Sequence, residues 1–152
     1  MAMAINPDFR DLFFEFNARD VRYLLVGGYA FSFHARPRNT KDLDIWIDAT
    51  PENGPRVWQA LVAFHAPLSE LKPSELTQPG IVFQMGQPPN RIDVLTRIEA
   101  VSFEEAWAAR VAGKYGDQSV AYLSRDLLIR NKRAVGRKQD LADIEVLEEL
   151  ED

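Results

Sequence analysis

The chain has 152 residues, of which 46% are apolar and nine are phenylalanine. This length predicts a single domain over residues 1–152, with a core at about 20–100 and a helical C-terminal part at about 101–152. The formal net charge of -5 argues against a protein that coats nucleic acid. The absence of cysteine excludes disulfides, thiolate metal sites and cysteine nucleophiles. Because no apolar run approaches 18 residues and no signal-peptide pattern opens the sequence, we expect a cytoplasmic protein that does not contact a membrane.

The first 64 residues switch between helical and alternating apolar periodicity. Asn6 followed by Pro7 is typical of a helix start, and the apolar residues after it recur at helical spacing. The short apolar runs that follow are rich in β-branched and aromatic residues, which favours strands. We therefore expect a helix at 7–18, a strand at 21–26, a helix at 29–35, a strand at 42–48 and a helix at 51–64.

The second half is expected to add one pair of strands and two helices. Proline, serine and glutamate are frequent at 65–80, which predicts an irregular segment. Two apolar runs flank the sequence QPPN and predict a hairpin or meander. The expected elements are strands at 81–86 and 91–96 and helices at 124–136 and 138–150. The fold class predicted is α+β, with a small mixed sheet of about four strands flanked by helices.

Three aspartates on the predicted strands are the candidate metal ligands and catalytic residues. On a strand, residues i and i+2 share a face and lie roughly 6–7 Å apart. Asp42 and Asp44 are therefore expected to project together, and Asp93 joins them if the strand at 91–96 is a neighbour. Such a cluster repels itself unless a cation is present, and without one an acid is expected to remain protonated. A solvated sheet face is the alternative explanation for Asp42 and Asp44 alone.

Gly27 and Gly28 follow the strand at 21–26 and precede a predicted helix. A glycine pair at such a junction lets backbone N–H groups approach a ligand at a helix N-terminus, where anions are favoured. A phosphate-binding turn beside a set of carboxylates is the combination needed for nucleotidyl transfer.

With these motifs the sequence resembles the polymerase-β-type nucleotidyltransferase superfamily. The resemblance is to the small AbiEii-like and minimal nucleotidyltransferase proteins, and it covers residues 20–147. It rests on LLVGGYA, RNTKDLDIWI, RIDVL and the later LLIRNKRAVGRKQDLADIEVL. The first three motifs are fairly specific, whereas helices rich in lysine and arginine are common.

The resemblance implies a role for each matching residue. Gly27 and Gly28 would lie against the phosphates of an NTP, and Asp42 and Asp44 would bind Mg²⁺ or Mn²⁺. Asp93 would help to hold the metal and would activate or orient the acceptor hydroxyl. The remaining nucleotide-binding candidates are Arg38, Thr40 and Lys132, and either Asp140 or Asp143 corresponds to a late acidic position.

The implied reaction is attack of a hydroxyl on the α-phosphate of an NTP, with pyrophosphate as the leaving group. The acceptor is left open between an RNA end, a protein hydroxyl as in toxin–antitoxin systems, and a small molecule such as an antibiotic. Basic residues between 125 and 138 lean slightly towards RNA or another macromolecule. Two alternatives are a non-catalytic nucleotide- or partner-binding module that retains the fold, and a metal-dependent phosphodiesterase or nuclease. The sequence predicts no oligomeric state.

Overall fold

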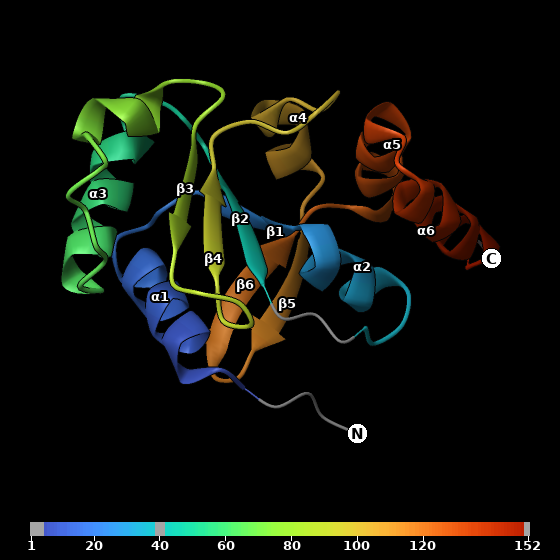
Figure 1. The fold of residues 1–152 in the computed structure, drawn as a ribbon, viewed down its shortest axis with the longest axis horizontal. Helices are drawn as coiled ribbons and strands as arrows, with labels where there is room; N and C mark the ends of the chain where they lie inside the picture. Colours follow the sequence, from blue (N-terminus) through green and yellow to red (C-terminus); the bar gives the residue numbers. More distant parts are fainter. Residues whose placement is uncertain (1–4, 39–41, 151–152) are drawn as a thin grey trace.

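A computed structural model describes residues 5–38 and 42–150 of the chain (Figure 1). The elements, in order, are α1 (Pro7–Ala18), β1 (Tyr23–Val26), α2 (Gly27–His34), β2 (Leu43–Ile47), α3 (Asn53–Ala63), the 3₁₀ helix η1 (Pro73–Thr77), β3 (Val82–Met85), β4 (Ile92–Leu95), α4 (Phe103–Ala108), β5 (Val111–Tyr115), β6 (Gln118–Tyr122), α5 (Arg125–Val135) and α6 (Lys138–Glu149).

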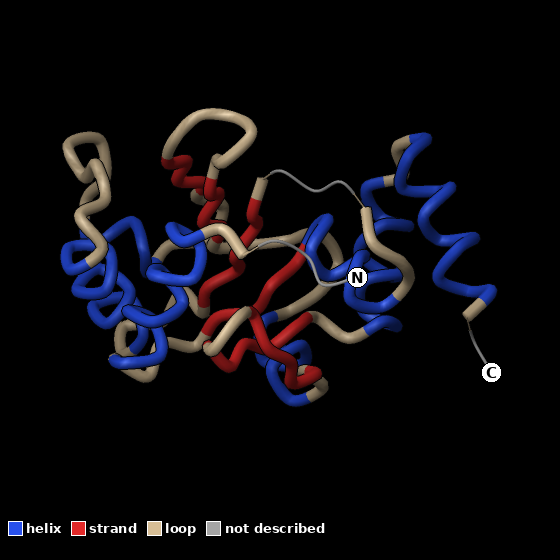
Figure 2. The backbone as a smooth tube through the Cα atoms, turned by 90° about the horizontal axis from the view of Figure 1, so that it is seen from below, coloured by secondary structure: helices blue, strands red, loops and turns tan. Residues whose placement is uncertain are grey.

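The strands form one mixed sheet in the order β3-β4-β2-β1-β6-β5. β2 lies antiparallel to β1 and parallel to β4, while β1 lies parallel to β6. The central strand β1 is buried along its whole length, as expected for its apolar sequence YLLV. Figure 2 shows the strands between two groups of helices.

The two groups of helices pack on different parts of the sheet. α1 packs on α3 and β6, and its buried phenylalanines Phe9, Phe13 and Phe16 belong to the main core. α2 packs on β1 and β2, and it also contacts α5 and α6, which lie beyond it at the right of Figure 1. α2 therefore lies between the sheet and the C-terminal helices. None of the helices in the described ranges is long and apolar enough to cross a membrane.

The sheet has six strands, so the expectation of about four strands was wrong. The two missed strands, β5 and β6, form an antiparallel hairpin within the part from 101 to 152 that was expected to be helical. Their sequences, VAGKY and QSVAY, mix apolar residues with glycine, lysine, glutamine and serine, because one face of each strand remains open to solvent. The apolar signal of such half-exposed strands is weak. The short helix α4 and η1 were also not predicted.

The strand expected at 42–48 begins one residue later than predicted, at Leu43. Asp42 consequently lies just before β2 rather than within it, and Asp44 is the second residue of that strand. The two closing helices agree with the sequence pattern. Gly136 separates them with a left-handed backbone (φ 71°), the conformation for which glycine is favoured at a helix end.

Candidate active site

Asp44 and Asp93 lie directly opposite each other on adjacent strands. β2 and β4 run parallel, and their register pairs Asp44 with Asp93, while β1 pairs Val26 with Asp44. The strand of Asp93 therefore adjoins the strand of Asp44, as the three-acid argument required. The carboxylates meet where β1 ends and where β2 and β4 begin, and Asp93 is only 7% exposed.

The close acids disturb the ionisation of Asp44. Burial is the largest cause, and the negative charges of Asp93 and Asp42 add to it, so that the pKa of Asp44 rises to about 6. The direction agrees with the expectation that one acid of the cluster would hold its proton more tightly. Negative charge at Asp44 is therefore incompletely balanced by the protein itself.

Arg91 is a member of the site that sequence reasoning missed. Its guanidinium donates two hydrogen bonds to Asp93, at 2.8 and 3.1 Å, and lies 3.5 Å from Asp42. Its backbone N–H donates to Asp42 Oδ1 at 3.3 Å. The available signal was its position two residues before Asp93, which places both side chains on one face of the chain.

Carboxylate oxygens are ligands suited to a hard cation such as Mg²⁺ or Mn²⁺, and the raised pKa of Asp44 marks negative charge that a cation would balance. The donor chemistry of Asp42, Asp44 and Asp93 thus fits such an ion. Within residues 5–38 and 42–150, however, no group of three or more His, Cys, Asp or Glu side chains has a geometry that could hold one. In this structure Arg91 is the positive group that faces Asp42 and Asp93.

Gly27 lies against Asp44 at the start of α2. Its φ of 62° is in the left-handed region, and a Cβ at this position would lie 2.2 Å from Asp44 Oδ2. Any side chain there would occupy the space beside the carboxylate. The N–H groups of the first turn of α2 have no capping side chain among the described residues, so the glycine turn presents free donors beside the acids.

Arg38 and Lys132, two predicted nucleotide-binding residues, lie together around Asp143. Lys132 Nζ is 2.9 Å from Asp143 Oδ2, and the Arg38 guanidinium donates two hydrogen bonds to the same carboxylate. Both cations lie over the ring of Phe31 in α2, with Arg38 Cζ at 3.9 Å from its centroid. Although burial opposes ionisation, hydrogen bonds from Arg38, Lys132 and Gln139 lower the pKa of Asp143 to about 2.

Asp140 and Asp143, between which the sequence left a choice, belong to the same group. Lys132 Nζ lies 3.7 Å from Asp140, whose main partner is Arg137 at 2.7 Å. The side chain of Arg137 is 75% exposed and donates two hydrogen bonds to Asp140, which raise the pKa of Arg137. The corner between α5 and α6 is therefore part of the group of charges around Lys132. Thr40 lies outside the described residues.

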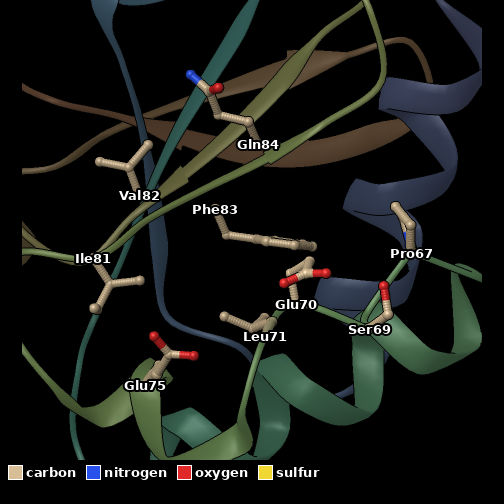
Figure 3. Close-up of a pocket in the computed structure, with 9 residues that line it drawn as sticks. All are labelled: Pro67, Ser69, Glu70, Leu71, Glu75, Ile81, Val82, Phe83 and Gln84. Atoms are coloured by element: carbon tan, nitrogen blue, oxygen red, sulfur yellow. The ribbon is translucent and has the colours of Figure 1, made fainter.

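A cavity of about 640 Å³ lies at the β3 edge of the sheet and is a poor candidate for this chemistry (Figure 3). The nine described residues that line it include the carboxylates Glu70 and Glu75 and no cation. A triphosphate would be repelled there. The acids, the glycine turn and the basic residues lie elsewhere, so we place the candidate active site at the start of α2.

We expect Asp44→Asn to stabilise the metal-free protein at neutral pH. Because the folded pKa of Asp44 is raised from its usual value, the unfolded chain loses its proton first as pH rises from about 4 to 6, and the folded state loses stability over that window. The variant should gain up to about 3 kcal/mol at pH 7 and almost nothing at pH 4. Urea unfolding at both pH values measures this. Asp11→Asn, an exposed substitution on α1, is the control, and equal effects of Asp44→Asn at both pH values would contradict the argument.

We expect Gly27→Ala to destabilise the protein more than Gly80→Ala. Both glycines have left-handed backbones, so both variants carry the same conformational cost. At Gly80 an added Cβ meets nothing within 4 Å, whereas at Gly27 it overlaps Asp44. The difference should be about 1–3 kcal/mol, measured by chemical denaturation. Equal losses would mean that Asp44 can move away from Gly27 without cost.

No protein-family model and no curated protein matches this sequence. Solved structures with a similar fold include the following two. The lincomycin-bound lincosamide antibiotic adenylyltransferase LnuA aligns with a TM-score of 0.61 at 14% identity, covering 97% of this chain and 99% of that chain. An antigenic nucleotidyltransferase-like protein from Paracoccidioides brasiliensis aligns with a TM-score of 0.52 at 16% identity, covering 91% and 72%. The chain therefore has a nucleotidyltransferase-like fold.

Proposed function

We propose that this chain is a metal-dependent nucleotidyltransferase that moves a nucleoside monophosphate from an NTP to a hydroxyl acceptor. One observation carries the proposal: the glycine turn that begins α2 lies directly against Asp44, which itself faces Asp93. A phosphate-binding backbone and a carboxylate pair are thus adjacent in a nucleotidyltransferase-like fold. AbiEii-like identity is a narrower assignment and remains part of the proposal.

Asp42, Asp44 and Asp93 are the residues we assign to Mg²⁺ or Mn²⁺. Such an ion, when bound, neutralises charge on the phosphate oxygens as the new bond forms. Asp44, with a pKa of about 6, is largely ionised at neutral pH and is available as a ligand. Arg91 competes for Asp42 and Asp93, so we infer that its guanidinium turns away, or moves onto a phosphate, when the substrate complex forms.

We assign the NTP phosphates to the glycine turn and to the basic residues that lie beside the Phe31 face of α2. The N–H groups of Gly27 and Gly28 would donate to phosphate oxygens, which the helix dipole also attracts. Arg137 is exposed and pairs with Asp140, which also lies beside Lys132, so we assign it to a phosphate contact as well. Arg38 and Lys132 pair with Asp143 in this structure. In the nucleotide complex they would contact both that acid and the triphosphate.

For the acceptor we favour a small molecule. LnuA is named as an antibiotic adenylyltransferase with lincomycin bound, and it aligns over nearly the whole of both chains. The basic residues that favoured RNA are largely engaged: Arg130 pairs with Glu105 at 2.7 Å, and Lys132 and Arg137 pair with acids of α6. A role in a toxin–antitoxin system has no support from these contacts.

A non-catalytic nucleotide- or partner-binding module is the second candidate. The observation that favours it is Arg91, which neutralises two of the three acids without any metal. An arginine that never leaves Asp93 would keep the carboxylates from an ion. The two candidates therefore differ in whether nucleotide binding requires the metal.

We expect one or more NTPs to raise the Tm only when Mg²⁺ or Mn²⁺ is present. A ligand at 100 times its Kd stabilises a protein by about 2.7 kcal/mol, or roughly 5–10 °C for a chain of this size. The shift should disappear in Asp44→Asn and in Asp93→Asn, and it should remain in Asp11→Asn. An NTP shift that does not depend on the metal or on the acids would favour the non-catalytic module. Turnover is then followed as transfer of label from the α-phosphate to candidate acceptors, with lincomycin among them.

We expect Arg91→Met to bind Mn²⁺ more tightly than the wild type does. Methionine fills space without charge, so Asp42 and Asp93 lose their competing cation. Titration calorimetry in the absence of nucleotide should show at least about a tenfold gain, corresponding to 1.4 kcal/mol. Arg97→Met, which removes an exposed arginine paired with Glu99, is the control. Unchanged Mn²⁺ affinity in Arg91→Met would mean that Arg91 does not compete with a metal.

A further inference from the structure

A second cavity, of about 480 Å³, is lined by residues of α2, of the β5–β6 hairpin and of the segment before α1. Its volume is within the range of small-molecule sites. Most of its lining is aromatic or aliphatic, and the polar groups are few, as is typical of a pocket that binds an organic ligand. The lining residues are Ile5, Tyr29, Ser32, Phe33, Pro37, Lys114, Tyr115, Gly116 and Tyr122.

The wall of this aromatic cavity includes apolar side chains that folding leaves exposed. Phe33 is 42% exposed and Ile5 is 45% exposed. The ring of Phe33 stacks on Tyr122 at 4.0 Å with an interplanar angle of 10°, so it presents a flat aromatic surface. Gly113 permits this stack, because a Cβ there would lie 2.7 Å from the Tyr122 ring and 3.2 Å from the Phe33 ring.

The aromatic cavity adjoins the candidate active site through α2. Tyr29, which lines the cavity, is only two residues after Gly27, and Gly27 lies against Asp44. The Tyr29 ring meets Tyr115 edge-on, with centroids 6.1 Å apart. Asp42 is among the charges that raise the pKa of Tyr29, after burial and Tyr115. Tyr29 is therefore the cavity residue that connects this wall to the glycine turn beside the acids.

The aromatic cavity and the basic group around Asp143 lie on opposite sides of α2. Successive residues of a helix are rotated by about 100°, so Tyr29, Ser32 and Phe33 share one face and Phe31 lies on the other. Phe31 carries Arg38 and Lys132 above its ring. Pyrophosphate needs cations, and in-line displacement requires the nucleophile to approach from the side opposite the leaving group. The acceptor should then enter from the aromatic side.

We propose that the aromatic cavity is the acceptor subsite and that it takes the aromatic ring of a small hydroxyl-bearing molecule. The inference rests on the proposed function and deepens it by naming the acceptor class. The acceptor oxygen bonds to the α-phosphorus, the bond between that phosphorus and the bridging oxygen breaks, and pyrophosphate leaves with the electron pair. The hydroxyl proton passes to Asp93. A nucleobase in the same cavity is the competing assignment.

The test uses the whole chain and a matched pair of probes, phenyl β-D-glucopyranoside and methyl β-D-glucopyranoside. Both carry the same sugar hydroxyls, and only the first has an aromatic ring. Binding at millimolar concentration is followed by ¹H–¹⁵N chemical-shift changes, without nucleotide and with each NTP and Mg²⁺. We expect the phenyl compound alone to bind, with its largest shifts at Ser32, Lys114 and Gly116. Phe33→Ala should weaken it roughly three- to tenfold, the worth of one aromatic pair.

Phe14→Ala is the control, because Phe14 is 45% exposed on α1 and does not line the aromatic cavity. Failure of the phenyl compound to bind, or equal binding to Phe33→Ala and wild type, overturns the assignment. Loss of the metal-dependent NTP shift in Phe33→Ala also overturns it, because the cavity would then hold the nucleobase. An intact NTP shift without probe binding removes only the acceptor subsite, whereas absence of any NTP shift removes the proposed function itself.

Discussion

The carboxylates of Asp44 and Asp93, opposed on two parallel strands, constrain the residues packed around them. Asp44 and Asp93 are fixed by the β2–β4 register, so they cannot separate unless one of these strands moves past the other. Like charges on opposed cross-strand neighbours destabilise a sheet. The strands remain in place because Ile45, Ile47 and Val94 project into the main core. Arg91 eases the repulsion locally by pairing with Asp93, and the raised pKa of Asp44 reflects its burial together with the repulsion that remains.

The C-terminal helices are attached by apolar residues such as Leu128 and Ile144, and also by a buried group of charges. Asp143 is 2% exposed and accepts hydrogen bonds from Arg38, Lys132 and Gln139, so three segments converge on one carboxylate. A buried ion group of this kind fixes geometry more than it adds stability, since both partners lose water. A triphosphate at Arg38 or Lys132, as we propose, would compete with Asp143 for these cations. Nucleotide binding and the position of α5 and α6 would then be linked.

The sequence predicted what depends on short-range pattern and failed where tertiary packing decides. The glycine pair, Asp44 and Asp93 were found because each follows or interrupts an apolar run, and helical periodicity placed α1, α5 and α6. The β5–β6 hairpin was missed because its open face dilutes the apolar signal. The contact of Arg91 with Asp42, unlike its contact with Asp93 two residues later, depends on which strands become neighbours. No sequence rule supplies that order for a mixed sheet.

The eight-residue helix α2 contacts three separate environments. Its glycine start lies against the acids, its Phe31 face supports the cations, and its Tyr29 and Phe33 face lines the aromatic cavity. A helix this short is not stable by itself, so its position depends on the sheet beneath it and on α5 and α6 beside it. Any ligand that pulls Arg38 or Lys132 from Asp143 therefore acts on the element that also shapes the cavity. In such an arrangement, binding of phosphate at Arg38 and Lys132 and binding of a ligand in the aromatic cavity would affect each other.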